Sequence, residues 1–306
     1  MIVIYGHADD PPIARVLEAV RDAEVEHTLL DQRELDRSDL IVDFSSADRQ
    51  GRIVFAGADV PLDAVNGVYA RPLGLPARWR NPLARMRAHA VHDAFLEWLE
   101  VAPTLVVNRP SSMDSNSSKP WQMQLIAAAG FLVPETLVTT DPDEVRDFLA
   151  RHGRVIFKSV SGVRSIVQEL DASDHGRLDR VKALATQFQA YIPGVDVRVH
   201  VVGDWTFAAE VRSSVIDYRY AARAGAEVGL EDIQIPDAVR DRCTTLARRL
   251  DLVFCGIDLR RRPDGEYVCF EVNPMPAYSY YEAETGQPIS RALVSLLSGQ
   301  RERWRQ

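Results

Sequence analysis

The first 110 positions alternate short apolar runs with segments of helical periodicity. Residues 2–5 form an apolar run, and a loop separates them from a segment with apolar residues at helical spacing. That segment predicts a helix whose buried face carries Ile13, Val16, Leu17 and Val20. Further apolar runs predict strands at 27–30, 40–44, 52–55 and 67–69. Strands that alternate with helices predict a small α/β domain with a parallel sheet.

A longer helix is predicted from 82 to 100, with an apolar face formed by Val91, Phe95, Trp98 and Leu99. His89 and His92 lie on the same helix. We expect them to be solvated or interfacial rather than metal ligands, because no other ligand-type cluster is visible beside them.

The pattern changes near residue 110, where we place a domain boundary. A serine-rich stretch at 111–118 is interpreted as a linker that leads into a helix beginning at Lys119. A second helix, capped by residues 141–144, is predicted to continue through Arg151. Strands are predicted at 155–160, 166–170, 188–192, 197–202 and 206–212. Antiparallel strands with helices between them indicate an α+β arrangement.

Composition then excludes several classes of protein. The chain has 306 residues, 36 Lys+Arg against 44 Asp+Glu, and a formal net charge of −8. The length suits two or three domains, and the acidic balance argues against a nucleic-acid partner, which needs a basic surface. No apolar stretch approaches the roughly 18 residues of a membrane span, and no basic segment precedes the first strand as in a signal peptide. We therefore expect a cytoplasmic enzyme.

The three cysteines are too few and too scattered for a disulfide framework or a zinc site. Two of them, Cys255 and Cys269, lie inside apolar runs, whereas Cys243 does not. We expect Cys255 and Cys269 to be ordinary core residues.

The sharpest chemical pattern is a hairpin near the C-terminal end. Asp264 and Gly265 form a dipeptide typical of a two-residue turn. Such a turn places Pro263 opposite Glu266 and Asp258 opposite Glu271. Two carboxylates directly opposed on neighbouring strands repel each other unless a counter-ion lies between them. A solvated hairpin face with two tolerated acids is the alternative interpretation.

Asn273 follows on the same face of this hairpin, opposite Gly256, which leaves space beside it. Carboxylate and amide oxygens are hard ligands that suit Mg²⁺ or Mn²⁺ bridging phosphates. Apolar residues on the other face predict that the hairpin is anchored in a core; they are Ile257, Leu259, Phe270 and Val272.

Two lysines are candidates for binding phosphate. Lys119 begins a helix after the polar stretch, and Lys158 ends an apolar run. A lysine that emerges from a buried strand is costly unless it meets an anion, although it can also extend to solvent. The loop that follows contains Ser161 and Gly162, and its N–H groups and hydroxyls are suited to covering phosphates.

In their order, these segments resemble the ATP-grasp superfamily, and within it the RimK-like branch. The motifs are Lys119, Lys158, QAYIPGVDVRV, VVGDWTFAAEVRSS, GIDL and FEVNP, and the similarity runs from about residue 108 to 297. The segments YGHADDPP, YARP and YYEAETGQPISRAL resemble those of the macrocycle-forming graspetide ligases, which mature peptides. The resemblance implies an ATP-grasp fold preceded by a Rossmann-like pre-ATP-grasp α/β domain. It implies domains at 1–110, 111–192 (central lid) and 193–306 (with the metal hairpin), and ATP between the last two.

The resemblance also implies roles for individual residues. Phosphates of ATP would be bound by Lys119, Lys158, Ser161 and Gly162, adenine by Gln189, Tyr191 and Ile192, and ribose by Asp196. Two Mg²⁺ ions, or Mn²⁺, would be held by Asp258, Glu271 and Asn273. The transferred phosphoryl group or the acyl phosphate would be stabilised by Arg198, Arg219 and Lys158. Ala190 stands where an acidic hinge residue is common in the family, and the phosphate loop SVSGVRS contains fewer glycines than that of glutamate ligases.

The implied activity is an ATP-dependent carboxylate–amine or carboxylate–hydroxyl ligase that acts on a peptide through an acyl phosphate. An amino-acid or small-metabolite ligase of the glutamate-ligase type is the first alternative. A nucleotide-binding regulatory module without turnover is the second. The resemblance further implies a homodimer or tetramer, and a peptide or amino-acid acceptor as the partner.

Overall fold

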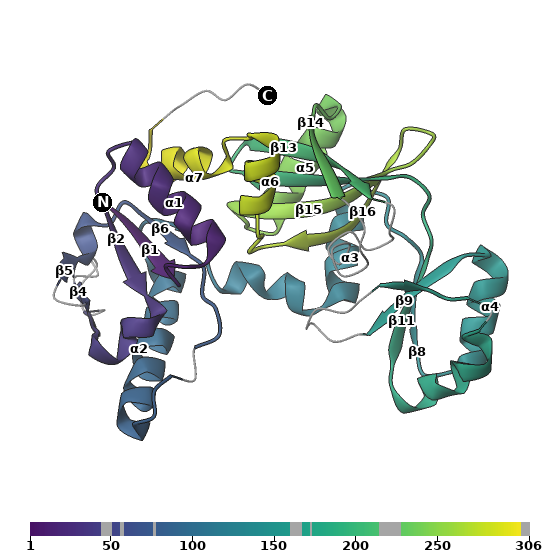
Figure 1. Cartoon of the computed structure of the whole chain (residues 1–306), viewed down its shortest axis with the longest axis horizontal. Coiled ribbons are helices and arrows are strands. Elements are labelled where there is room, and N and C mark those ends of the chain that lie inside the picture. Colours follow the sequence, from purple (N-terminus) through teal and green to yellow (C-terminus); the bar gives the residue numbers. More distant parts are fainter. Residues whose placement is uncertain are drawn as a thin grey trace.

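The computed structural model describes residues 1–43, 51–55, 58–75, 78–159, 167–171, 173–213 and 228–300. Figure 1 shows an N-terminal α/β part, a large C-terminal sheet with its helices, and a smaller sheet-and-helix unit beside it. Among the described residues, no helix is both long and apolar enough to cross a membrane.

The N-terminal part is built on a parallel sheet, as the apolar pattern predicts. Its strand order is β2-β1-β6-β7, and every neighbouring pair runs parallel. The strands are β1 (Ile2–Gly6), β2 (His27–Asp31), β6 (Gly67–Ala70) and β7 (Leu105–Val107). Two helices pack on this sheet, α1 (Pro11–Asp22) and α2 (Pro82–Val101). A short 3₁₀ helix, η1 (Gln32–Arg37), follows β2.

Two strands predicted for this parallel sheet belong elsewhere. The segments near 40 and 52 form β3 (Asp39–Val42) and β4 (Gly51–Phe55), which pair antiparallel with each other and with β5 (Ala58–Pro61). Parallel neighbours need a crossover of a dozen or more residues, whereas consecutive strands joined by short connections pair antiparallel. A second 3₁₀ helix, η2 (Leu62–Ala64), follows β5.

Helix α2 covers the N-terminal sheet with the predicted apolar residues. Phe95, Trp98 and Leu99 are buried, and Val91 packs partly against the same core. His89 is exposed, and His92 is half-buried with Nδ1 hydrogen-bonded to the Tyr5 hydroxyl. His89 is therefore solvated, which is one of the two positions expected for this pair, and His92 packs against the first strand of the same N-terminal part.

The central part is a four-stranded antiparallel sheet covered by a helix. Its order is β10-β9-β11-β8, and Phe188 of β11 packs with Val145 and Phe148 of α4. The serine-rich stretch before it is not an extended linker: it forms η3 (Ser111–Ser117), and α3 (Lys119–Ala128) begins at the predicted lysine. The other elements are β8 (Thr136–Thr139), α4 (Pro142–His152), β9 (Val155–Ser159), β10 (Gln168–Glu169), η4 (His175–Ala183) and β11 (Thr186–Ala190).

The C-terminal part is a five-stranded antiparallel sheet in the order β14-β13-β12-β15-β16. The strands are β12 (Val195–Val202), β13 (Trp205–Ser213), β14 (Val228–Ile233), β15 (Phe254–Arg261) and β16 (Tyr267–Asn273). The helices are α5 (Asp237–Arg249), α6 (Ser279–Thr285) and α7 (Ile289–Ser298).

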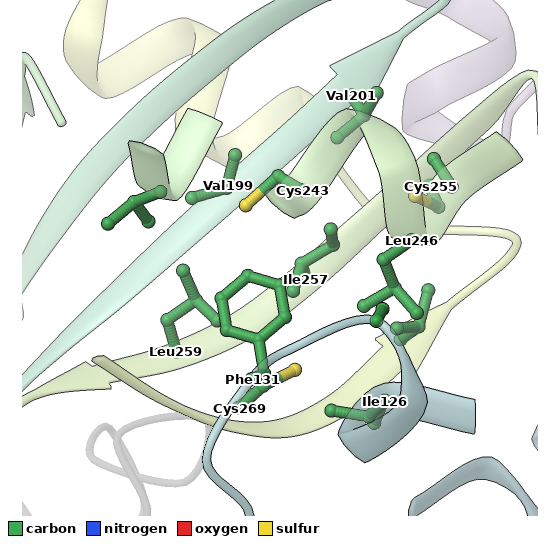
Figure 2. Close-up of a cluster of buried hydrophobic side chains, with 14 of the residues drawn as sticks. Ile126, Phe131, Val199, Val201, Cys243, Leu246, Cys255, Ile257, Leu259 and Cys269 are labelled. Carbon is green, nitrogen blue, oxygen red and sulfur yellow. The ribbon is translucent and has the colours of Figure 1, made fainter. Parts of the chain in front are cut away.

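One face of this sheet packs against α5 and α3 through a continuous core, shown in Figure 2. Cys243, Cys255 and Cys269 are all buried in this core as free thiols, which confirms the prediction for the second and third. Because burial penalises the thiolate, it raises the pKa of the Cys255 thiol to about 12. The opposite face of the sheet remains for the polar residues described below.

The N-terminal and C-terminal parts are joined by a buried arginine. Arg71 follows β6, and its guanidinium donates to Asp10 Oδ2 at 2.5 Å and to the carbonyls of Met275 and Pro276 at 3.0 and 3.1 Å. Helices α1 and α7 lie side by side at the same junction (Figure 1). The segment that follows β16 is therefore anchored to the carboxyl end of the N-terminal sheet.

Candidate active site

Asp258 and Glu271 lie directly opposite each other on β15 and β16, as the hairpin arithmetic predicts. Gly256 pairs with Asn273 in the same register, so all three oxygen-bearing side chains belong to one face of the hairpin. Residues from β12 and from α3 then complete this face, which lies on the side of the sheet opposite the core of Figure 2.

The predicted turn, however, is wrong by one residue. Arg261 pairs with Tyr267, and the Arg262 N–H donates to the Glu266 carbonyl at 2.8 Å, so residues 263–265 form a longer loop. A β-bulge between Asp258 and Leu259 compensates, because it adds one residue to β16. The register at Asp258 is therefore the predicted one, although the turn is not.

The bulge also moves Phe270 out of the core. Leu259 pairs with Cys269, and Cys269 is fully buried in the position that the two-residue turn would assign to Phe270. Phe270 is half-buried, and its ring lies 5.3 Å from the Arg260 guanidinium. The other predicted core residues, Ile257, Leu259 and Val272, are buried as expected.

Each carboxylate of the hairpin is paired with its own base. Arg198 Nη1 lies 2.5 Å from Asp258 Oδ1, and Lys119 Nζ lies 2.5 Å from Glu271 Oε1. Arg198 comes from the adjacent strand β12, in register with Asp258, whereas Lys119 is the first residue of α3. These two cations offset the repulsion between the opposed acids.

Gly256 makes room for the Arg198 side chain. A Cβ atom added at this glycine would overlap the Arg198 guanidinium, which crosses β15 at this point. The space beside Asn273 that the sequence indicates is therefore filled by an arginine. The Arg198 side chain is only 7% exposed, so its contact with Asp258 is formed by a buried guanidinium.

Helix α3 also fixes the position of β16. One turn after Lys119, Gln122 donates from Nε2 to the Val272 carbonyl at 2.8 Å and accepts from the Val272 N–H at 3.1 Å. β16 is the edge of the sheet, and this side chain satisfies its outer hydrogen-bonding groups between Glu271 and Asn273. The i, i+3 spacing of Lys119 and Gln122 on one helix face is the signal that would have revealed this role.

A buried asparagine positions the far ends of both strands. Asn108 donates from Nδ2 to the carbonyls of Phe254 and Pro274, both at 2.6 Å, and accepts through Oδ1 from the N–H groups of Val253 and Phe254. Asn273 Oδ1 accepts from the Met275 N–H at 2.9 Å, which fixes its amide beside the carboxylates. An amide oxygen has a second lone pair, so this bond leaves Asn273 compatible with a metal ion.

The residues predicted to bind adenine and ribose lie at the end of β11 (Gln189), on the connection that follows it (Tyr191 and Ile192) and at the start of β12 (Asp196). Gln189 is buried and donates to Thr136 Oγ1 at 3.2 Å, while Tyr191 is half-buried under the Arg154 guanidinium, 3.6 Å from its ring centre. Arg260 joins this connection to the hairpin, with Nη1 2.9 Å from the Ile192 carbonyl and Nη2 2.7 Å from Asp196 Oδ1.

Sequence reasoning missed Arg260, although its position two residues after Asp258 puts it on the same face of β15. That spacing is the signal that could have identified it as a neighbour of the site. In the structure, Arg260 links the β11–β12 connection to the hairpin through Asp196 and Ile192.

Lys158 lies on β9, half-buried and opposite Gln187 of β11. It therefore belongs to the central sheet rather than to the sheet that carries the hairpin acids. Ser161, Gly162 and Arg219 lie outside the described residues.

The donor set fits a hard divalent cation that also binds phosphate. Within the described ranges, no group of three or more His, Cys, Asp or Glu side chains could hold a metal ion by itself. Asp258, Glu271 and Asn273 would supply some of the oxygen ligands of Mg²⁺, which usually keeps waters and takes phosphate oxygens for the rest. The neighbouring Arg198 and Lys119 add positive charge suited to the same anion.

Comparison with known proteins gives consistent likenesses. Residues 116–297 match the RimK-like ATP-grasp domain. The ATP-grasp ligase PsnB, solved with a phosphomimetic variant of a minimal precursor, Mg and ADP, is 30% identical with a TM-score of 0.79 over 98% of each chain. The macrocyclase MdnC of Microcystis aeruginosa MRC, bound with its precursor peptide MdnA, is 20% identical with a TM-score of 0.79, over 98% of this chain and 100% of MdnC. A probable alpha-L-glutamate ligase of Pseudoalteromonas atlantica is 24% identical over 221 residues, which span 69% of this chain and 72% of that ligase.

Proposed function

The chain belongs to the RimK-like ATP-grasp family and is an ATP-grasp ligase, and on that premise we propose that its acceptor is a peptide. The expected ATP-grasp fold is thereby confirmed. In the proposed reaction, a peptide carboxylate takes the γ-phosphoryl group of ATP to give an acyl phosphate and ADP. An amine or hydroxyl of the peptide then displaces phosphate and forms an amide or ester.

The observation that carries this proposal is the extent of the likeness to PsnB. It covers 98% of the chain at 30% identity, and so includes the N-terminal α/β part. The likeness to the glutamate ligase spans 69% of the chain at 24% identity. A shared N-terminal part favours a shared class of acceptor, because this part lies beside the proposed site. Arg71 anchors it directly to the segment that follows the hairpin.

Proteins of this family bind ATP with Mg²⁺, which neutralises phosphate charge and polarises the phosphoryl oxygens when it is bound. We assign Asp258, Glu271 and Asn273, which lie on one face of the hairpin, to hold it, and we propose two ions, as the family resemblance implies. Gln122 and Asn108 hold the backbone on either side of these ligands, so the ligands need little reorganisation on binding.

The basic side chains act on the phosphates and on the charge that develops during transfer. Arg198, fixed by Asp258, is suited to the transferred phosphoryl group, and Lys119 and Lys158 to the phosphates of the nucleotide. Arg219, Ser161 and Gly162 keep the roles implied by the family resemblance. Gln189, Tyr191 and Ile192 would contact adenine, and Asp196, oriented by Arg260, would contact ribose.

An amino-acid ligase is the second candidate, and a specific observation favours it. The curated relatives are named as probable alpha-L-glutamate ligases, with 24% and 27% identity for the first two. In that reaction, the same acyl phosphate would be attacked by the amino group of a free amino acid. The two candidates share the ATP site and differ only in the acceptor.

Product analysis separates the two candidates. Purified protein is incubated with Mg·ATP and peptides encoded beside its gene, with and without free amino acids, and phosphate release and peptide mass are followed together. Loss of one or more waters from a peptide would support intramolecular ester or amide formation. Gain of an amino-acid residue mass would support the second candidate, and ATP hydrolysis without any peptide product would contradict both. Sedimentation velocity on the same sample tests the proposed homodimer or tetramer.

A further inference from the structure

His200 is a fully buried imidazole next to the active-site arginine. It lies on β12, two residues after Arg198, and pairs in register with Gly256 on β15 and with Phe207 on β13. Its ring centre lies 4.9 Å from that of Tyr281 and 6.4 Å from that of Phe254. Its Nδ1 atom has no hydrogen-bond partner within the described part of the chain.

Arg198 contacts this imidazole through a different nitrogen from the one that contacts Asp258. Its Nε donates to His200 Nε2 across 3.4 Å, and its Nη1 donates to Asp258 Oδ1 across 2.5 Å. A guanidinium has donors and no acceptor, so Nε2 must accept and the proton of the imidazole lies on Nδ1. Two contacts at different nitrogens fix the plane of the guanidinium, and the direction of every remaining N–H is fixed with it.

From this geometry, and resting on the proposed function, we propose that His200 is a positioning residue for phosphoryl transfer. Through Nε2 it holds the Arg198 guanidinium in the orientation that meets the transferred phosphoryl group. The contact with His200 attaches the guanidinium at a second nitrogen, in addition to the contact that Nη1 makes with Asp258. His200 does not contact the reacting atoms and acts only through Arg198.

The surroundings of His200 keep it in the accepting form. Burial, followed by the positive charge of Arg198, holds the pKa of the imidazole well below its usual range. A neutral imidazole accepts from Arg198, whereas a protonated one would place two cations in contact in a buried site. The aromatic rings of Tyr281 and Phe254 pack beside the imidazole, so it has little room to rotate.

Two substitutions separate the hydrogen bond from the packing. His200→Phe keeps a flat ring and removes the acceptor, whereas His200→Gln keeps an acceptor on a side chain that reaches the same position as Nε2. Phe254→Leu is the matched control, because it changes packing against the same imidazole without removing a polar contact of Arg198.

Binding is measured by calorimetry with Mg·ADP alone, and then with Mg·ADP plus aluminium fluoride as a mimic of the transferred phosphoryl group. We expect His200→Phe to bind Mg·ADP with an affinity within about twofold of wild type. The increase in affinity that aluminium fluoride causes is expected to be about tenfold smaller in this variant than in wild type. His200→Gln is expected to recover most of that gain, and Phe254→Leu to retain it. In turnover, His200→Phe should lower kcat about tenfold with little change in the KM for ATP.

A double-mutant cycle tests whether the effect passes through the arginine. In an Arg198→Lys background, His200→Phe is expected to cause no further decrease in the affinity that aluminium fluoride adds to Mg·ADP binding. A His200→Phe protein that keeps the full gain, or a Phe254→Leu protein that loses as much, would overturn the role of His200. A wild-type protein that gains no affinity from aluminium fluoride would instead contradict phosphoryl transfer, and with it the proposed function.

Discussion

Asp258 and Glu271 face each other across β15 and β16, and each is neutralised by a base that reaches it from outside the hairpin. Arg198 lies one strand away on β12, and Lys119 belongs to a helix 152 residues before Glu271. A pair of acids that would repel each other in an isolated hairpin is thus stabilised by two elements that the fold brings to it. The same four side chains form the centre of the proposed ligase site.

Replacing Glu271 tests the metal site. Glu271→Ala is expected to lower ATP turnover at least a hundredfold while the protein stays folded, because it removes a carboxylate ligand from the phosphate site. Turnover is followed as ADP formation, and folding by circular dichroism. Glu266→Ala is the matched control, since it removes an exposed glutamate that directly follows the loop of the same hairpin. Wild-type turnover in Glu271→Ala would exclude the hairpin as the metal site.

Lys158→Met tests phosphate binding from the central sheet. It is expected to weaken the affinity for ATP about tenfold, because it removes a positive charge that would contact the phosphates and keeps a side chain of similar length. Calorimetric titration with Mg·ATP gives the affinity. Lys182→Met serves as a control, because this lysine is exposed and pairs with Asp179 on the surface of the same subdomain. An unchanged affinity would mean that Lys158 only extends to solvent.

Gly256→Ala tests the space that Arg198 occupies. The added methyl group would overlap the guanidinium, so we expect Arg198 to lose its contact with Asp258 and turnover to fall about a hundredfold. Gly229→Ala is the control, because it is a strand glycine of the same sheet with its nearest neighbour 3.8 Å from the added atom. Comparable turnover in the two variants would show that the position of Arg198 is not needed for activity.

Arg71→Met tests the junction between the N-terminal and C-terminal parts. Arg71 and Asp10 are 8% and 12% exposed, and breaking such a buried pair is expected to cost about 3 kcal/mol of unfolding free energy. Arg87→Met removes an exposed pair with Asp39 and should cost no more than about 1 kcal/mol. Urea unfolding of both variants gives the comparison, and equal costs would contradict a structural role for the Arg71 junction.

The stability of the protein should also depend on His200 at mildly acidic pH. The pKa of His200 is lowered in the folded state, by burial first and then by Arg198, so below about pH 6.5 the unfolded chain binds a proton that the native imidazole excludes. Among the described residues, the aromatic side chains of Tyr281 and Phe254 pack beside the ring, and Arg198 is the charged group that contacts it.

The direction of this effect follows from proton uptake by the unfolded state. Lowering the pH from about 7 to about 5.5 should reduce the free energy of unfolding of wild type by about 1 kcal/mol more than that of His200→Gln. That variant has no titratable group at position 200. Urea unfolding at the two pH values measures the difference. Because both proteins keep His92, whose pKa is also lowered chiefly by burial, its contribution cancels in the comparison. An identical loss in both proteins would place the proton uptake elsewhere.

Local periodicity is sufficient to identify much of the site from the sequence. Period-two alternation places Glu271 and Asn273 on one face of their strand, and helical spacing places Ile13, Val16, Leu17 and Val20 in the core. The order of the motifs predicts the ATP-grasp fold. These features depend on backbone geometry and on neighbours in the sequence, so the sequence by itself determines them.

Only the tertiary structure decided what surrounds those residues. The bulge that restores the register at Asp258 and moves Phe270 toward Arg260 depends on how β16 packs against α3 and the core. The short connection between β3 and β4 favours their antiparallel pairing, but the apolar pattern does not show that they leave the parallel sheet. The partners Arg198, Lys119 and His200 meet the site from elements that are distant in sequence or lie across the sheet. Such contacts form only when separate elements pack together, because no local pattern specifies which buried charge will meet which partner.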